Sequence, residues 1–119
     1  MKVIYNNIIP FPAFDAINLF GVLFARKETE KFSNTQKWHD IINHEEIHTA
    51  QMEETLYVGF YILYILFWLF RLLQTWSFEK AYFNISFEQE AYEFEKDFTY
   101  LERRQPYAWM SYQFLTSKK

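Results

Sequence analysis

The sequence predicts a mainly α-helical (α+β) fold, with a small N-terminal β-sheet followed by a helical domain that contains a helical hairpin. Three features predict it. The first 32 residues are rich in Val, Ile and Phe without helical spacing, the next segment repeats apolar residues at three- and four-residue steps, and a continuous apolar run follows. A chain of 119 residues fits one domain, residues 1–119, with a core of its own.

The composition narrows the classes of function. Half of the residues are hydrophobic and only two are glycine, which is typical of a folded chain. The formal net charge of -3, without a basic stripe, argues against nucleic acid as a partner. Because the chain has no cysteine, any metal must be held by nitrogen and oxygen ligands. The first residues lack the apolar core and cleavage site of a signal peptide, so we expect a cytoplasmic location.

The N-terminal segment is expected to form two or three short strands, punctuated by Pro10 and Gly21. Residues 18–26 are the best strand candidate. This run fits a sheet edge, where its backbone can pair with an extended peptide, and it fits a plain core strand equally well.

The middle of the chain is expected to hold two helices. Asn34 or Thr35 can cap the first, whose apolar residues keep helical spacing as far as about Leu56. The second contains the apolar run 56–70, whose length lies between that of a buried helix and that of a membrane span.

The last third of the chain is expected to hold a short helix and a long one. Ser77 can start the short helix. Ser86 and Gln89 have the spacing of a capping box for the long helix, which Pro106 should end. The remaining residues, 106–119, have the pattern of a short amphipathic cover.

The most informative motif is His44-Glu45-Glu46-Ile47-His48, which matches H-E-x-x-H on the first helix. Four residues make about one helical turn, so both imidazoles project from the same face and can bind one zinc ion. Glu45 lies beside them, where its carboxylate can act as the catalytic base toward a water molecule on the metal. The alternative is a coincidence of spacing on a helix face that points at solvent.

A catalytic zinc site usually has three protein ligands, and the third histidine, His39, lies on another side of the helix. A carboxylate at the start of the last helix is the remaining candidate. Glu88 and Glu90 both lie there, and helical periodicity puts Glu90 closer to the apolar stripe. The residues alone therefore leave both open, together with a solvated acidic helix start that binds no metal.

H-E-x-x-H, then Gln51, and then E-x-E-A beginning at Glu88 on a later helix, resembles the gluzincin group of zinc metallopeptidases. Within that group it is most similar to the minimal zincins related to CAAX prenyl proteases. Those proteases commonly have aspartate directly after the alanine, whereas this chain has Tyr92, so the usual support for a metal ligand is not expected here.

The resemblance implies a zincin-like domain in which His44, His48 and Glu88 hold the zinc and Glu45 is the base. Glu90 stays the alternative third ligand. Gln51, one turn past His48, is compatible with orienting a ligand and with simple exposure to solvent.

The apolar run lies between the two halves of this site. A single crossing of a bilayer would put His48 and Glu88 on opposite sides, about 30 Å apart. We therefore expect a core helix of the hairpin or, alternatively, a helix at a membrane surface. Five aromatic residues with polar tips leave peripheral membrane contact open: Tyr57, Tyr61, Tyr64, Trp68 and Trp76.

These features predict a zinc-dependent metallopeptidase in which Glu45 activates a zinc-bound water to attack a carbonyl of a peptide or protein substrate. The alternative is a non-catalytic zincin-like module that binds metal or associates with a membrane. An aromatic-rich helical interaction domain without metal is the third hypothesis.

Overall fold

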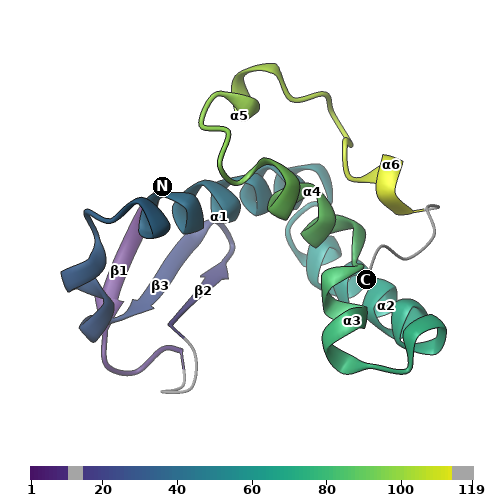
Figure 1. Ribbon diagram of the computed structural model, residues 1–119, viewed down its shortest axis with the longest axis horizontal. Helices are drawn as coiled ribbons and strands as arrows, with labels where there is room; N and C mark the ends of the chain where they lie inside the picture. The colour runs from purple at the N-terminus through teal and green to yellow at the C-terminus, as the bar shows by residue number, and fades with distance from the viewer. Residues whose placement is uncertain (11–14, 114–119) are drawn as a thin grey trace.

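The computed structural model describes residues 1–10 and 15–113 (Figure 1). Its strands are β1 Lys2–Asn6, β2 Ala16–Leu19 and β3 Val22–Arg26, followed by a 3-10 helix, η1 Lys27–Phe32. Its α-helices are α1 Gln36–Glu54, α2 Val58–Thr75, α3 Phe78–Phe83, α4 Ser86–Phe94, α5 Tyr100–Arg103 and α6 Met110–Gln113. The predicted fold class is confirmed, because a small N-terminal sheet precedes a helical remainder.

The sheet has the order β1-β3-β2, in which β1 is parallel and β2 antiparallel to β3. The prediction of one strand over residues 18–26 is wrong, because the chain reverses at Phe20 and Gly21, which both have positive φ. This tight turn makes a hairpin and puts β3 in the middle of the sheet. The edges of the sheet are therefore β1 and β2, and β2 is bonded to α1 through the side chain of Asn18.

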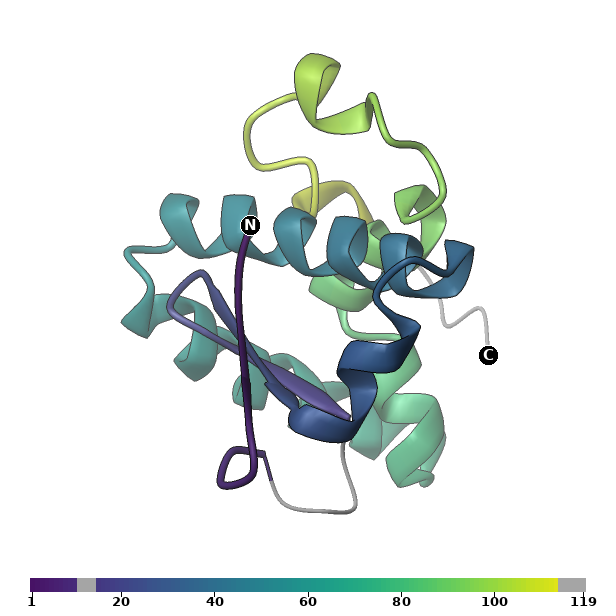
Figure 2. The same cartoon turned by 90° about the vertical axis from the view of Figure 1, so that its left-hand side faces the viewer.

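Helix α1 lies across the sheet and carries the H-E-x-x-H motif (Figures 1 and 2). Thr35 caps it as predicted, since its side-chain oxygen accepts a hydrogen bond from the N–H of Trp38 at 3.2 Å. Trp38 then packs in a buried cluster with Leu23 and Ala25 of β3. Burial of these apolar side chains fixes the motif helix against the sheet.

Helices α2 and α3 form the predicted hairpin. Ser77 accepts a backbone N–H from the first turn of α3, which therefore begins where expected, and Trp68 of α2 stacks on Phe78. The prediction of a core helix is wrong for α2. Only Phe60 and Arg71 of its 18 residues are buried, and one face of the helix is exposed.

The prediction of one long helix after Ser86 is also wrong, because α4 ends at Phe94 and a separate short helix, α5, follows. The side-chain amide of Asn43 donates to the carbonyls of Phe94, Glu95 and Asp97 at 3.2, 2.8 and 3.1 Å. These contacts from α1 satisfy the carbonyls at the end of the helix. The turn that results lets the ring of Tyr100 stack on that of Phe94.

The predicted capping box does not form. Ile85 is the N-cap residue of α4, and Ser86 is already helical. The segment after Pro106 does cover the core, since Trp109 and Tyr112 are buried. Residues 114–119 of that predicted cover lie outside the described residues.

Candidate metal centre and catalytic site

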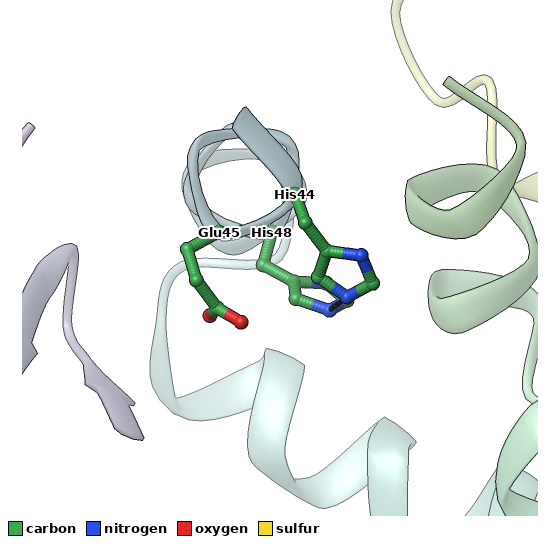
Figure 3. A group of neighbouring side chains, drawn as sticks. All are labelled: His44, Glu45 and His48. Atoms are coloured by element: carbon green, nitrogen blue, oxygen red, sulfur yellow. Dashed lines mark hydrogen bonds between the residues drawn. The ribbon is translucent and has the colours of Figure 1, made fainter. Parts of the chain in front are cut away.

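The two motif histidines and Glu88 meet at one point between α1 and α4. His44 and His48 project from the same side of α1, as Figure 3 shows. Their Nε2 atoms lie 3.1 Å apart, and Oε1 of Glu88 lies 3.1 Å from each of them. All three side chains are buried. Three residues that sequence reasoning grouped together are thus in contact in the fold.

The close packing of α1 on α4 makes this meeting point. Ile47 and Ala91 are both completely buried and lie in one cluster between the two helices. The methyl side chain at position 91 allows the two helices to pack closely. Ile47 faces α4 beside the histidines. Burial of its apolar side chain therefore holds the face of α1 that carries His44 and His48 against α4.

The other ring nitrogens fix the protonation of both histidines. Nδ1 of His44 lies 2.8 Å from a carboxylate oxygen of Glu95, which can only accept, so this nitrogen carries the proton. Nδ1 of His48 lies 2.8 Å from Oε1 of Gln51. The amide nitrogen of Gln51 donates to Glu90 at 2.9 Å, so its oxygen is the atom that faces His48. In the neutral imidazoles, each Nε2 therefore carries a lone pair.

Three acceptor atoms facing one another require a positive charge between them. Without a metal, a proton on His48 supplies it. Burial alone would lower the pKa of His48, but the carboxylates of Glu88 and Glu45 outweigh it and raise that pKa to about 9. Burial favours the neutral form of Glu88, yet His48 and His44 hold the pKa of Glu88 well below its ordinary value.

The same three atoms fit a zinc ion. Ligand atoms at ~2.0 to 2.2 Å from a tetrahedral zinc lie roughly 3.3 to 3.5 Å from one another. The separations of 3.1 Å in this site are close to that requirement. Two imidazole nitrogens and one carboxylate oxygen also form a donor set typical of catalytic zinc. Glu45 belongs to the same cluster, within 4.8 Å of the histidine nitrogens, but Glu88 is nearer.

The second oxygen of Glu88 is held from α2. The hydroxyl of Tyr64 donates to Oε2 of Glu88 at 2.6 Å. Burial, and then the negative charge of Glu88, raise the pKa of Tyr64, so the hydroxyl keeps its proton and remains a donor. This contact leaves Oε1 to face the two histidines.

Glu90 lies in a different environment. Its carboxylate accepts hydrogen bonds from Gln51, from Tyr100 at 2.7 Å and from the guanidinium of Arg104. The structure therefore places Glu88, and not Glu90, beside the histidines. Glu90 instead holds Gln51, which in turn holds His48. Gln51 was compatible with orienting a ligand and with exposure to solvent. The structure shows it fully buried and in contact with His48.

Glu95 was missed by sequence reasoning. At the position where the resembling proteases have aspartate, the ring of Tyr92 packs edge-on against His44, with 4.5 Å between ring centroids. The carboxylate that binds His44 comes instead from Glu95, just after α4 ends. Glu95 keeps helical φ and ψ and lies seven residues, about two helical turns, after Glu88, so this spacing on one helix face is the signal that could have identified it.

Glu45 projects from α1 next to His44 and His48 (Figure 3). Its side chain is half-buried, and within the described residues its carboxylate forms no hydrogen bond or ion pair. It lines two clefts, of about 710 and 460 Å³, which therefore adjoin at this residue. The larger cleft is mainly apolar and includes Ile17, Met52 and Phe60, whereas the smaller one includes Lys37, Asp40, Lys96 and Glu95.

Tyr82 of α3 also lines both clefts. Its hydroxyl lies 2.9 Å from that of Tyr92. Burial, and then the negative charge of Glu88, raise the pKa of Tyr82, which keeps the hydroxyl protonated. Sequence reasoning did not single out this residue among nine tyrosines.

Strand β2 forms a wall of the larger cleft. The side-chain amide of Asn18 donates to the backbone carbonyl of Glu45 at 3.0 Å, and the hydroxyl of Tyr61 donates to the carbonyl of Asn18 at 3.2 Å. These bonds tie the strand to α1 and α2. In the part of the chain that the structure describes, no strand pairs with the outer edge of β2.

Comparison with protein-family models, with curated proteins and with solved structures gives no match. The resemblance to gluzincins thus has only the motif residues behind it. The remaining histidine, His39, is exposed and lies outside the site, as expected. Conclusions about function therefore depend on the geometry described above.

Proposed function

We propose that the protein is a zinc-dependent peptidase. The observation that carries the proposal is the convergence of His44, His48 and Glu88, whose three acceptor atoms lie 3.1 Å from one another. Each of these side chains is oriented by a hydrogen bond at its other polar atom, as metal ligands in proteins commonly are. Two histidines and one carboxylate leave the fourth position of a zinc ion for water or substrate.

The chemistry then divides between the metal and the side chains. When bound there, zinc would supply Lewis acidity, lowering the pKa of a water ligand to ~7 and polarising a carbonyl group. Glu45 accepts a proton from the attacking water and returns it to the nitrogen of the leaving amine. Tyr82 stays protonated and donates a hydrogen bond to the carbonyl oxygen as negative charge develops on it.

The edge of β2 is the element of the fold suited to align a substrate. An extended peptide that pairs with Ala16–Leu19 would run past Glu45, because Asn18 is bonded to the backbone of that residue. The larger cleft would then accept an apolar side chain on one side of the scissile bond. This gives β2 the edge role that was one of the two interpretations left open for residues 18–26.

The alternative is a zincin-like module with a structural metal. Structural zinc sites are usually closed by four protein ligands. Here three donor side chains converge, and Glu45 beside them lines an open cleft, with no partner for its carboxylate within the described residues. This arrangement favours catalysis over a purely structural role.

Metal content and one pair of variants test the proposal. We expect about one zinc per chain after gentle purification, and a rise in the unfolding temperature on adding zinc. Glu45→Gln should keep the zinc but cut peptides in a mixed library about 10²- to 10⁴-fold more slowly. Glu46→Gln, the adjacent carboxylate, is the matched control and should resemble the parent. Equal product from Glu45→Gln and parent, or a chain that neither carries zinc nor is stabilised by it, contradicts the proposal.

A further inference from the structure

Helix α2 exposes an apolar face along its whole length. The α2 apolar face consists of Val58, Ile62, Ile65, Leu66, Leu69, Phe70, Leu73 and Trp76. Their exposed fractions run from 45% to 84%. At roughly 100 Å² each, these eight side chains expose on the order of 800 Å², more than the ~300 to 600 Å² of the largest patch on a typical monomer. Apolar patches of this size usually mark a surface that binds a protein or a membrane.

No charged side chain lies on this face. The only ionised group of α2 is Arg71, which is buried on the opposite side and donates to Gln74 and to the carbonyl of Tyr112. By length and composition α2 is a candidate membrane span, with a mean hydropathy of 1.6 and only 11% of its residues buried. A core helix of a soluble protein passes the same test, but it would be mostly buried.

The helix cannot be surrounded by lipid on all sides. Tyr64, on its inner side, donates to Glu88, and Trp68 packs against Phe78 at the start of α3. The chain before α2 and the chain after it also meet at the 3.1 Å contact between His48 and Glu88. The chain therefore returns to the side from which it came, and only the outer face of α2 is available.

The width of the α2 apolar face favours lipid over a second copy of the chain as its partner. At about 100° per residue, its side chains span an arc of about 140° around the helix. The apolar seam of a two-helix dimer is narrower. A convex, uncharged ridge about 27 Å long can be covered across its full width by fluid acyl chains, which bury the outer face of such a helix by ~5 to 10 Å.

The C-terminal end of the helix suits the membrane–water boundary. Trp76 ends α2 in a left-handed conformation and is among the most exposed side chains described. Phe78, two residues further on, is also exposed, and the charged residues Glu79 and Lys80 follow it. Exposed aromatic rings at the end of an apolar helix, with charged side chains beyond them, are typical of the interfacial region.

We propose that the α2 apolar face docks on a lipid bilayer, with the helix lying in the plane of the membrane. This goes beyond the proposed peptidase function and does not depend on it. The expected contact residues also differ from those that the sequence suggested, because Tyr61 and Tyr64 point inward to β2 and to Glu88.

Vesicle flotation tests the proposal on the full chain. The parent should float with neutral phosphatidylcholine vesicles, and the bound fraction should change little between low and high salt because the face carries no charge. Ile65→Lys/Leu69→Lys should lower the partition constant about tenfold or more. Phe32→Lys/Phe98→Lys alters two equally exposed apolar residues elsewhere and should bind like the parent. Glu45→Gln should also bind like the parent, which separates docking from catalysis.

A second readout uses the fluorescence of the parent and one conservative substitution at an exposed position. Brominated acyl chains should quench the fluorescence of the parent, and the quenching should fall in Trp76→Phe, which removes the most exposed tryptophan. Failure of the parent to float with neutral vesicles overturns the proposal. So does salt-sensitive binding restricted to anionic vesicles, or a dimer in solution that Ile65→Lys/Leu69→Lys dissociates while no variant binds lipid.

Discussion

A carboxylate oxygen of Glu95 lies 2.8 Å from Nδ1 of His44, although the two residues are 51 positions apart in the chain. This contact puts the proton of His44 on Nδ1 and turns Nε2 toward Glu88. A hydrogen bond of this kind raises the basicity of a ligating imidazole and holds its ring in place. Asn43, next to His44 on α1, also donates to the backbone carbonyl of Glu95 at 2.8 Å, so α1 holds Glu95 by its backbone as well as by its side chain.

Glu95→Gln tests this relationship. Loss of the negative charge should lower the affinity for zinc by up to about 10- to 100-fold, because a neutral amide oxygen can still accept from Nδ1–H of His44 but raises the basicity of the imidazole less than a carboxylate does. Competition with a chelator measures that affinity. Glu102→Gln, an exposed carboxylate on α5, is the control. An unchanged affinity in Glu95→Gln would show that the charge of Glu95 does not contribute to metal binding.

The choice between the two candidate third ligands can be decided directly. Glu88→Gln should abolish stoichiometric zinc binding, because it removes the oxygen that faces both histidines. Glu90→Gln should keep the zinc but lower the free energy of unfolding by about 1 to 3 kcal/mol, since Gln51, Tyr100 and Arg104 lose a charged acceptor. Elemental analysis and urea unfolding give the two quantities. Loss of zinc in both variants would contradict this division of roles.

The ion pair of Glu54 with Arg104 should make stability depend on pH. Burial opposes ionisation of Glu54, but Arg104 and the N–H of Tyr107 outweigh it and hold the pKa below its ordinary 4.5. A carboxylate with a lowered folded-state pKa stabilises the fold above its unfolded-state pKa and loses this contribution as the pH falls. Urea unfolding of Glu54→Gln should therefore differ from the parent more at pH 7 than at pH 4. The exposed neighbour Glu53 supplies the control, Glu53→Gln, whose difference should be small at both values.

The larger cleft predicts a substrate preference if the chain cuts peptides. Peptides with a large apolar residue next to the scissile bond should be cut faster than those with a charged one. Ile17→Asp places a charge in the cleft wall and should lower kcat/KM for apolar peptides about tenfold or more. Phe32→Asp changes an exposed residue outside the cleft and should leave kcat/KM unchanged. Equal kcat/KM values for Ile17→Asp and Phe32→Asp would show that this cleft does not bind the substrate.

Local patterns predicted the parts of the fold that depend on local interactions. Thr35 and Ser77 cap helices because each oxygen reaches an N–H only three residues away. The histidines of the motif share a face because one helical turn separates them. In each case the partners lie close together in the chain, so spacing alone carries the information.

Contacts between distant segments explain what was missed. The sequence near Phe94 contains no helix-terminating signal, because the side chain that binds the carbonyls at the end of α4 is Asn43 of α1. The reversal at Phe20 had only Gly21 as a local signal. The exposed face of α2 could not be told from a buried one, because an apolar run has the same composition in either setting.

The polar contacts of Arg104 connect the segment after α5 to the candidate metal centre. Arg104 joins Glu54 to Glu90, and Glu90 holds Gln51, the partner of His48. Three successive contacts therefore link the guanidinium to the ring of His48. A residue 56 positions further along the chain thus supports the orientation of this imidazole without contacting it.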